Sequence, residues 1–183
     1  MSNKTPLIVQ VDSALARLAY CCHPNGCPRD RTCCVGMAVS VSRAEIRMID
    51  SLMDELARLI PGLRHERGYA NVFVEESHGM QIDPRDERGT RPFLFAQRGR
   101  AVCAIHHIAL RTAREVTAVK PRACRHWPLV LERRGQQVRI TVHPGAQMIG
   151  CVAPLAELPG QPSIRAAFAA EIKELQHLAR GHR

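Results

Sequence analysis

The residues of this chain best suited to chemistry are its eight cysteines, which are unevenly distributed. Five of them fall in one short stretch, C-C-H-P-N-G-C-P-R-D-R-T-C-C, as Cys21, Cys22, Cys27, Cys33 and Cys34. The other three stand alone farther along the chain, as Cys103, Cys124 and Cys151. Thiolate sulfur binds zinc, Cu(I) and iron–sulfur clusters in preference to harder ions. The distribution therefore indicates a soft-metal site whose ligands come from several parts of the chain.

The ligand geometry of such a site limits how these cysteines combine. A tetrahedral site holds four ligands about 2.0–2.3 Å from one ion, so the side chains must converge. Adjacent Cys33 and Cys34 join one cluster only where the backbone bends; otherwise one serves a second ion or packs as a small apolar group. One four-thiolate centre and two separate centres both remain open. The predicted ligands are Cys22, Cys27, Cys33, Cys34, Cys103, Cys124 and Cys151.

The residues around Cys124 suggest what else would surround a bound metal. Pro121 and Pro128 bracket Cys124 and are expected to stiffen its loop, because proline fixes φ. Arg125 is a candidate to offset thiolate charge or to donate hydrogen bonds to sulfur, although a surface position is the alternative. Trp127 is expected in the core or as a lid over the site. His106 is a further possible ligand, but we expect it to be hydrogen-bonded or solvated instead.

Length and composition favour a single folded domain over residues 1–183. The chain has 183 residues, 45% of them apolar, which suits one domain with a real core. Its start has no secretory signal pattern, and no apolar stretch is long enough to span a membrane. We therefore expect a cytoplasmic protein with reduced thiols, which argues against disulfides. The net charge of +9 comes mainly from dispersed arginines with few aromatic residues, so nucleic-acid binding is not favoured but stays open.

The pattern of elements predicts an α+β fold, with helices near both ends framing short β-hairpins and Cys-rich loops around a metal site. The start is ambiguous, since residues 7–11 alternate like a strand and 14–19 suggest helical turns. Residues 21–36 are rich in turn formers and are expected to be loop. The remaining expected elements are a helix from 43 to 60 behind a capping box at Ser42, a strand at 72–74, a hairpin of 93–95 with 101–103, a helix at 105–114 with Ala113 facing inward, a hairpin of 129–131 with 138–142, and a C-terminal helix at about 163–180.

Taken together, three motifs resemble those of the YkgJ-type cysteine-cluster family, described as a zinc- or iron-chelating domain. The matching residues are Cys22, Cys27, Cys33, Cys34 and Gly36, then Cys103, Ala104, Ile105, His106, Ala109 and Leu110, then Lys120, Pro121, Cys124, Arg125, Pro128 and Leu129. The resemblance runs from about residue 20 to 155. It implies a cytoplasmic bacterial metal-binding module with a thiolate-bound zinc ion or iron–sulfur cluster. The chain departs from the tightest family pattern by a longer gap before Cys33 and by the additional Cys21, so either Cys21 or Cys22 is the ligand.

Three functions are compatible with these observations. The first is a metal-binding protein that holds Zn²⁺ or an iron–sulfur cluster, [4Fe–4S] if the metal is iron, in a structural, metal-handling or electron-transfer role. The second is an iron–sulfur-dependent redox or group-transfer enzyme, because similar cysteine motifs occur in flagellin lysine N-methylases. No common nucleotide-binding or hydrolase motif supports an enzyme, and whether the protein is one stays open. The third is a zinc-stapled module that binds nucleic acid or a protein partner.

Overall fold

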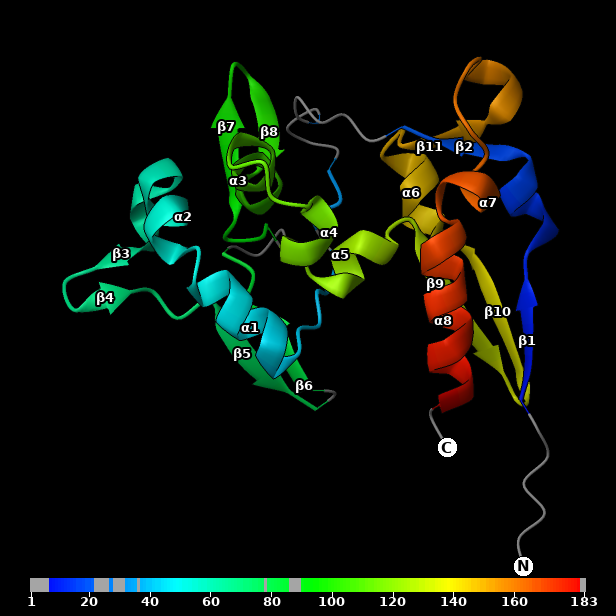
Figure 1. Ribbon diagram of the computed structural model, residues 1–183, viewed down its shortest axis with the longest axis horizontal. Coiled ribbons are helices and arrows are strands. Elements are labelled where there is room, and N and C mark those ends of the chain that lie inside the picture. The colour runs from blue at the N-terminus through cyan, green and yellow to red at the C-terminus, as the bar shows by residue number, and fades with distance from the viewer. Residues whose placement is uncertain are drawn as a thin grey trace, which may run out of the picture. The chain divides into compact units, whose positions relative to one another are not determined.

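The chain divides by its internal contacts into two compact units (Figure 1). A computed structural model describes residues 7–21, 27, 32–35, 37–77, 79–85 and 90–181. The end unit combines Met1–Cys22 with His126–Arg183, and the middle unit is His23–Arg125. Both contain short helices together with short strands, which confirms the α+β class. The single domain expected over residues 1–183 stays a prediction.

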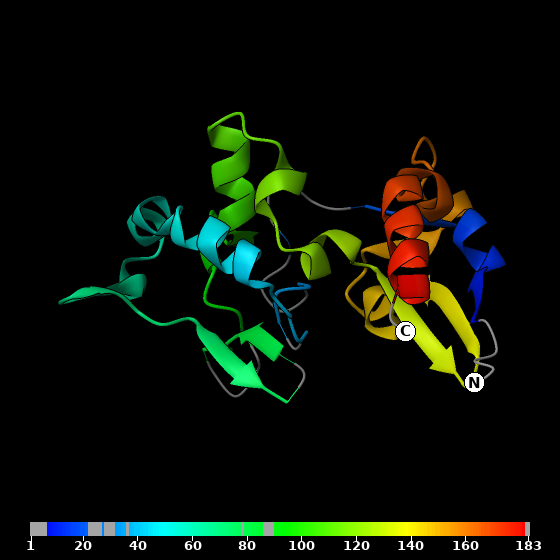
Figure 2. The ribbon, with the colours of Figure 1, turned by 60° about the horizontal axis from the view of Figure 1, so that its bottom comes forward.

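The end unit is built on a three-stranded sheet of order β1-β10-β9. Its elements are β1 (Ile8–Val11), η1 (Ser13–Ala16), β2 (Leu18–Tyr20), β9 (Leu129–Arg134), β10 (Gln137–Val142), α6 (Pro144–Met148), β11 (Val152–Pro154), η3 (Leu155–Glu157), α7 (Ile164–Ala167) and α8 (Ala169–Gly181). Strand β1 runs parallel to β10, and β10 pairs antiparallel with β9 in the predicted hairpin. Helix α8 contacts β1 and β10, so it covers the sheet face that carries buried Val138 and Ile140 (Figure 2).

The C-terminal helix is in two pieces. The chain leaves helical geometry at Phe168, with φ −110° and ψ 28°, between α7 and α8. The Ser163 side chain caps α7 by accepting a hydrogen bond from the Ala166 N–H at 3.3 Å. Five apolar residues at helical spacing, Ile164, Phe168, Ile172, Leu175 and Ala179, are all buried. The C-terminal helix predicted at about 163–180 is therefore present with one buried face, although it is not continuous.

The middle unit packs helices and hairpins around one apolar core. Its elements are α1 (Arg43–Asp50), α2 (Met53–Leu59), η2 (Pro61–Leu63), β3 (Arg64–His65), β4 (Gly68–Tyr69), β5 (Phe73–Glu76), β6 (Gly79–Ile82), β7 (Leu94–Gln97), β8 (Arg100–Cys103), α3 (Ala104–Arg111), α4 (Val116–Val119) and α5 (Arg122–His126), whose last residue belongs to the end unit. The core includes Ile49, Leu52, Leu56 and Ile105, all 2% exposed or less. The predicted strand at 72–74 corresponds to β5, and the predicted hairpin before Cys103 is β7–β8.

Two helix predictions need correction. The capping box is present, since Ser42 and Glu45 bond reciprocally at 2.7 and 3.3 Å, but the helix expected to reach residue 60 is interrupted after α1. The Ser51 hydroxyl donates to the Met48 carbonyl at 2.6 Å, and a serine that bonds back to the backbone in this way competes with helix continuation. Ala113 does not face inward. It is exposed at φ 52°, in the left-handed conformation that ends α3.

No helix in the described part of the chain is long and apolar enough to cross a bilayer.

Candidate metal centre

Four thiols from three separate segments of the middle unit interact with one another. Cys34 is hydrogen-bonded to both Cys33 and Cys103. Cys124 lies close enough to feel the charge of Cys103 and of Cys33. We call these four residues, Cys33, Cys34, Cys103 and Cys124, the four-thiol cluster. They are four of the seven predicted ligands.

The backbone around Cys33 and Cys34 bends, which is what lets two adjacent residues join one cluster. The Cys34 N–H donates to the hydroxyl oxygen of Thr32 at 3.2 Å, and the Val35 N–H donates to the Thr32 carbonyl at 3.1 Å. Thr32 is itself buried, at 4% exposed. On the far side, the Arg91 N–H donates to the Cys34 carbonyl at 2.9 Å. The turn is therefore tied to the segment that leads into β7.

Cys103 occupies the junction between β8 and α3. It is the last residue of the strand, paired with Leu94 of β7, and it is also the N-cap of α3. The backbone N–H groups of Ile105 and His106 at the helix start help to lower the pKa of Cys103, although its sulfur makes no capping hydrogen bond. Unpaired N–H groups and the helix dipole favour negative charge at this position. The hairpin-to-helix junction thus delivers a sulfur that is ready to be a thiolate.

Cys124 lies on a short helix rather than in the expected loop. Pro121 directly precedes α5 and suits a helix start, because its fixed φ is already helical. The Arg122 N–H at that start donates to the Glu45 carboxylate at 2.5 Å, which ties α5 to α1. Cys124 packs, partly buried, against the apolar core. The prolines therefore position Cys124 through a helix start and not through a stiffened loop.

The thiols divide into two that ionise readily and two that hold their protons. The hydrogen bond from Cys34 lowers the pKa of Cys103 to about 6, and the Lys120 charge also favours its thiolate. A hydrogen bond from Cys34 likewise lowers the pKa of Cys33. The hydrogen bonds that Cys34 makes to Cys103 and Cys33 raise its own pKa well above the ordinary value. Burial, with the negative charge of Cys103, raises the pKa of Cys124 to about 12.

Two cations accompany the cluster, and the sequence analysis assigned a role to neither. Lys120 favours the thiolates of Cys33 and Cys103 by its charge. Lys120 belongs to the same sequence motif as Pro121 and Cys124, and this position in the motif is the sequence signal that could have revealed its role. Arg91 carries no such signal, because its role depends on three-dimensional packing.

Arg91 is held rigidly beside the cluster. It is 8% exposed, and its guanidinium donates to the carbonyls of Met37 and Ile82. Burial lowers its pKa, whereas the charges of Cys124 and Cys34 raise it. Its Nε is buried and finds no acceptor among the described residues. A buried N–H without an acceptor, near thiols, is a donor that a metal-bound sulfur can use.

Cysteine sulfur is the donor type that soft metals prefer. Four sulfurs around one zinc ion at about 2.3 Å would lie roughly 3.8 Å from each other by tetrahedral geometry. Zinc with four thiolates would carry a net charge of about −2, which Lys120 and Arg91 together would offset. Within the described ranges, no group of three or more His, Cys, Asp or Glu side chains is arranged so that it could hold a metal ion. Metal binding would therefore require the sulfurs to shift and to lose the thiol protons that now link them.

The other predicted ligands have different surroundings. Cys22 lies outside the described residues. Cys27 forms an isolated bridge with Ala101, two residues before Cys103, through backbone hydrogen bonds of 2.8 and 2.9 Å. Cys151 is buried in the end unit, where its carbonyl accepts from the Cys21 N–H at 2.9 Å. Ligation by Cys22, Cys27 and Cys151 stays a prediction.

The auxiliary residues are only partly characterised. Trp127 belongs to the end unit, is 7% exposed and packs on His143 with ring centroids 5.0 Å apart. Arg125 follows Cys124 in α5, and its N–H donates to the Pro121 carbonyl at 3.0 Å. The cofactor-binding roles of Arg125 and Trp127 stay predictions. Burial and the Lys120 charge lower the pKa of His106.

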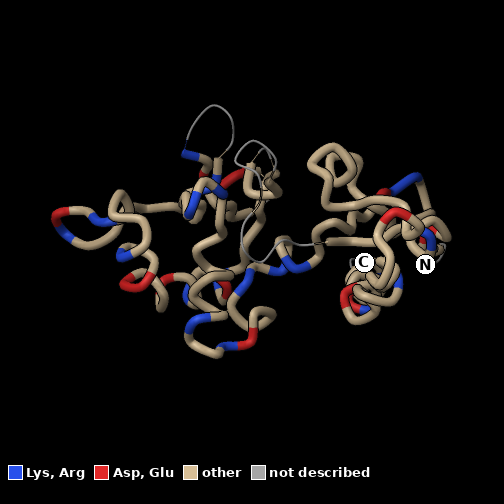
Figure 3. The backbone as a smooth tube through the Cα atoms, turned by 90° about the horizontal axis from the view of Figure 1, so that it is seen from above, with Lys and Arg blue, Asp and Glu red and all other residues tan. Residues whose placement is uncertain are grey.

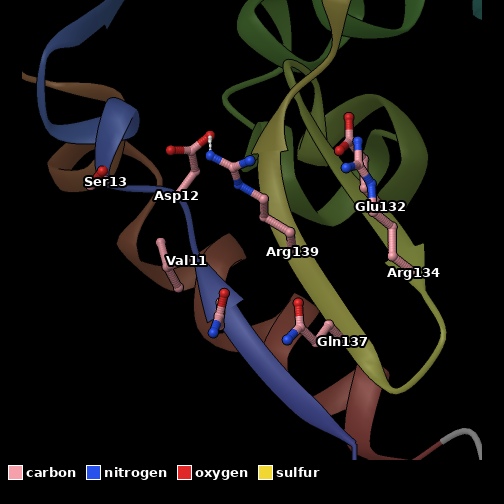
Figure 4. Close-up of a pocket in the computed structure, with 8 residues that line it drawn as sticks. Val11, Asp12, Ser13, Glu132, Arg134, Gln137 and Arg139 are labelled. Atoms are coloured by element: carbon pink, nitrogen blue, oxygen red, sulfur yellow. Dashed lines mark ion pairs between the residues drawn. The ribbon is translucent and has the colours of Figure 1, made fainter.

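A cavity of about 490 Å³ opens in the end unit and includes none of the predicted site residues (Figure 4). It lies on the polar face of the sheet, opposite the face that α8 covers. Arg139 and Asp12 form an ion pair across it at 2.8 Å, and Thr141 also donates to Asp12 at 2.8 Å. Lysine and arginine positions are scattered over both units (Figure 3). Neither feature points to the chemistry that the cysteines suggest.

Comparison with known proteins adds no relative: no family model, curated protein or solved structure matches the chain.

Proposed function

We propose that this protein is a metal-binding module in which Cys33, Cys34, Cys103 and Cys124 hold one zinc ion or one iron–sulfur cluster as thiolates. The observation that carries the proposal is the meeting of four thiols from three distant segments, through hydrogen bonds and mutual charge. The proposal agrees with the resemblance to the YkgJ-type cysteine-cluster family, membership of which we also propose.

Each residue of the site has a role in this proposal. Cys103 and Cys33 are the thiolates that a metal ion would meet first, because their pKa values are lowered. Cys34 and Cys124 would complete the set by releasing protons, so metal uptake is expected to acidify an unbuffered solution. Lys120 and Arg91 would balance the charge, and Arg91 Nε would donate to a sulfur. A bound metal would supply structural linkage as zinc, or one-electron transfer as an iron–sulfur cluster.

The state of the cysteines also supports the proposed cytoplasmic location. None of the seven cysteines that the structure describes is in a disulfide. Reduced thiols are the usual state in the cytosol, where glutathione and thioredoxin maintain them. In the reduced protein, a bound metal would link the chain segments that are otherwise linked by hydrogen bonds between their thiols. The described residues favour neither the enzymatic nor the nucleic-acid-binding alternative.

Anaerobic purification followed by metal and acid-labile sulfide analysis tests the proposal. We expect either one zinc per chain without sulfide, or iron and sulfide in equal amounts. Cys124→Ser is expected to lower the metal content, while the matched variant Cys21→Ser, in the end unit, is expected to retain it. A chain that carries no metal under anaerobic conditions, or equal metal content in both variants, would contradict the proposal.

A further inference from the structure

Two cysteines outside the four-thiol cluster lie opposite one another in the end unit. Strand β2 pairs antiparallel with β11, with Tyr20 opposite Val152 and Ala19 opposite Ala153 (Figure 1). The next pair along this register is Cys21 with Cys151. The Cys21 N–H donates to the Cys151 carbonyl at 2.9 Å, so the ladder continues through this pair. Cys21 and Cys151 are therefore direct cross-strand neighbours.

The cross-strand position brings the two sulfurs within reach of a covalent bond. Residues directly opposite in an antiparallel pair project from the same face of the ladder. Their Cα atoms are about 5.5 Å apart in a hydrogen-bonded pair. Disulfides form between Cα atoms about 4.4–6.8 Å apart. The Cα separation is therefore compatible with a Cys21–Cys151 disulfide. The Cβ atoms of such a pair, about 5.5 Å apart, must approach to about 3.5–4.5 Å, so the disulfide would be strained and easily reduced.

The two thiols differ in how easily solvent reaches them. Cys151 is 6% exposed, whereas Cys21 is partly exposed, and neither residue is in a disulfide. A dissolved oxidant therefore meets Cys21 first, and the buried partner is placed to resolve the oxidised sulfur. A reactive thiol beside a resolving thiol is the usual arrangement of a reversible oxidation site.

We propose that Cys21 and Cys151 form a redox modification site, in which hydrogen peroxide or a related peroxide closes a reversible disulfide. The Cys21 thiol first loses two electrons to the peroxide, giving a sulfenic acid and one water. The Cys151 sulfur then attacks the Cys21 sulfur, and the sulfenic oxygen leaves as a second water. Two thiols and one peroxide thus give one disulfide and two waters. A dithiol reductant reverses the step by thiol–disulfide exchange.

This assignment also bears on the adjacent pair Cys21 and Cys22. A sulfur engaged in this disulfide is not available to a metal. The predicted ligand Cys151 is therefore withdrawn from the metal in the oxidised protein, and Cys22 rather than Cys21 is left as a candidate ligand in the cysteine-rich stretch. The disulfide does not depend on the metal centre, because none of the four-thiol cluster takes part in it. Its success or failure is therefore distinguishable from that of the proposed function.

Peptide mapping of the full chain tests the disulfide. The reduced protein, as purified, is treated with one equivalent of hydrogen peroxide, and its remaining thiols are blocked with N-ethylmaleimide. Tryptic digestion near neutral pH then separates the peptide of residues 18–29 from that of 140–165, which contain Cys21 and Cys151 respectively. We expect these peptides to be recovered joined, with fragmentation placing the bond at Cys21. Dithiothreitol should separate them again.

Two matched variants complete the test. Cys21→Ser is expected to lose the joined peptides, whereas Cys22→Ser is expected to keep them. A bond located at Cys22 would overturn the assignment. So would Cys21 and Cys151 both remaining alkylated while peroxide oxidises other cysteines. Because the mapping of the unaltered chain is decisive by itself, the result stands even where a variant folds poorly.

Discussion

The hydrogen bond from Cys34 is predicted to control the ionisation of Cys103 in the metal-free protein. This bond is the foremost cause of the lowered pKa of Cys103, about 6 against an ordinary value of 9.0. The perturbation is Cys34→Ala, which removes the donor and leaves the junction between β8 and α3 in place. The metal-free, reduced protein is the state to use, because a bound metal would occupy both sulfurs.

The expected change follows from the strength of the bond. A hydrogen bond to a charged group contributes about 1.5–3 kcal/mol. At about 1.36 kcal/mol per pKa unit, its loss raises the pKa by roughly 1–2 units. The midpoint of Cys103 ionisation should therefore move from about 6 to about 7–8 in Cys34→Ala. Near neutral pH, Cys103 would be mostly thiolate in the unaltered protein, whereas at least half of it would be protonated in Cys34→Ala.

The rate of Cys103 alkylation by iodoacetamide, measured against pH by mass spectrometry, reports this midpoint. Only the thiolate reacts, so the pH profile gives the pKa whatever the absolute rate. Lys120→Met should also move the midpoint upward, because Lys120 stabilises the thiolate. Arg111→Met removes a cation at the other end of α3 and serves as the matched control. A midpoint near 9 in the unaltered protein, or one that Cys34→Ala leaves in place, would refute the reasoning.

Further consequences concern stability, beginning with pH. The folded-state pKa of Cys103 lies below that of the unfolded thiol, so its contribution is fully present above about pH 9 and is lost as pH falls through about 6. Unfolding of the metal-free protein by urea should thus require more free energy as pH rises from 6 to 8, by at most about 1.4 kcal/mol per unit; a decrease in this range would contradict the reasoning. Nearer pH 9 the raised pKa values of Cys34 and Cys124 act in the opposite direction, because those thiols ionise more readily in the unfolded chain. Arg91→Met leaves two buried carbonyls without donors and should cost about 2–5 kcal/mol in urea denaturation; a loss below about 0.5 would count against it. Trp127→Phe should cost less than about 1.5 kcal/mol in thermal unfolding, because the indole N–H has no acceptor among the described residues; a larger loss would reveal one. Ala113→Gly should relieve the backbone strain at φ 52°, which should raise the free energy of unfolding by up to about 1 kcal/mol and raise the melting temperature. Ala109→Gly inside α3 should lower the melting temperature, and the reverse order would refute this.

Local signals explain which elements could be predicted from the sequence. The capping box at Ser42 and the predicted hairpin before Cys103 depend on a few neighbouring residues, and both are present. The break at Ser51 depends on one hydroxyl that bonds back to a carbonyl, which hydrophobic spacing does not reveal. Strand β6 was not predicted, because Gly79–Ile82 gains its strand pairing from β5 rather than from its own weak alternation.

The candidate site divides in the same way. Cysteine type and motif order predicted that distant thiols belong together, and four of them do interact. Which of the seven would meet could not be predicted, because it depends on the bend at Thr32 and on the start of α5. Arg91 was not predicted either, since only packing turns a dispersed arginine into a buried partner of the cluster. The opposition of Cys21 and Cys151 likewise follows from strand register, which connects residues 130 positions apart.

X-ray absorption at the edge of the bound metal tests the central claim most directly. Four sulfur neighbours at about 2.3 Å are expected in the anaerobically purified protein. Cys124→Ser should remove one of them from a zinc ion, or one from a single iron of a [4Fe–4S] cluster, whereas Cys21→Ser should change nothing. A first shell dominated by nitrogen or oxygen, or a sulfur shell that Cys124→Ser leaves intact, would contradict a metal centre built from the four-thiol cluster.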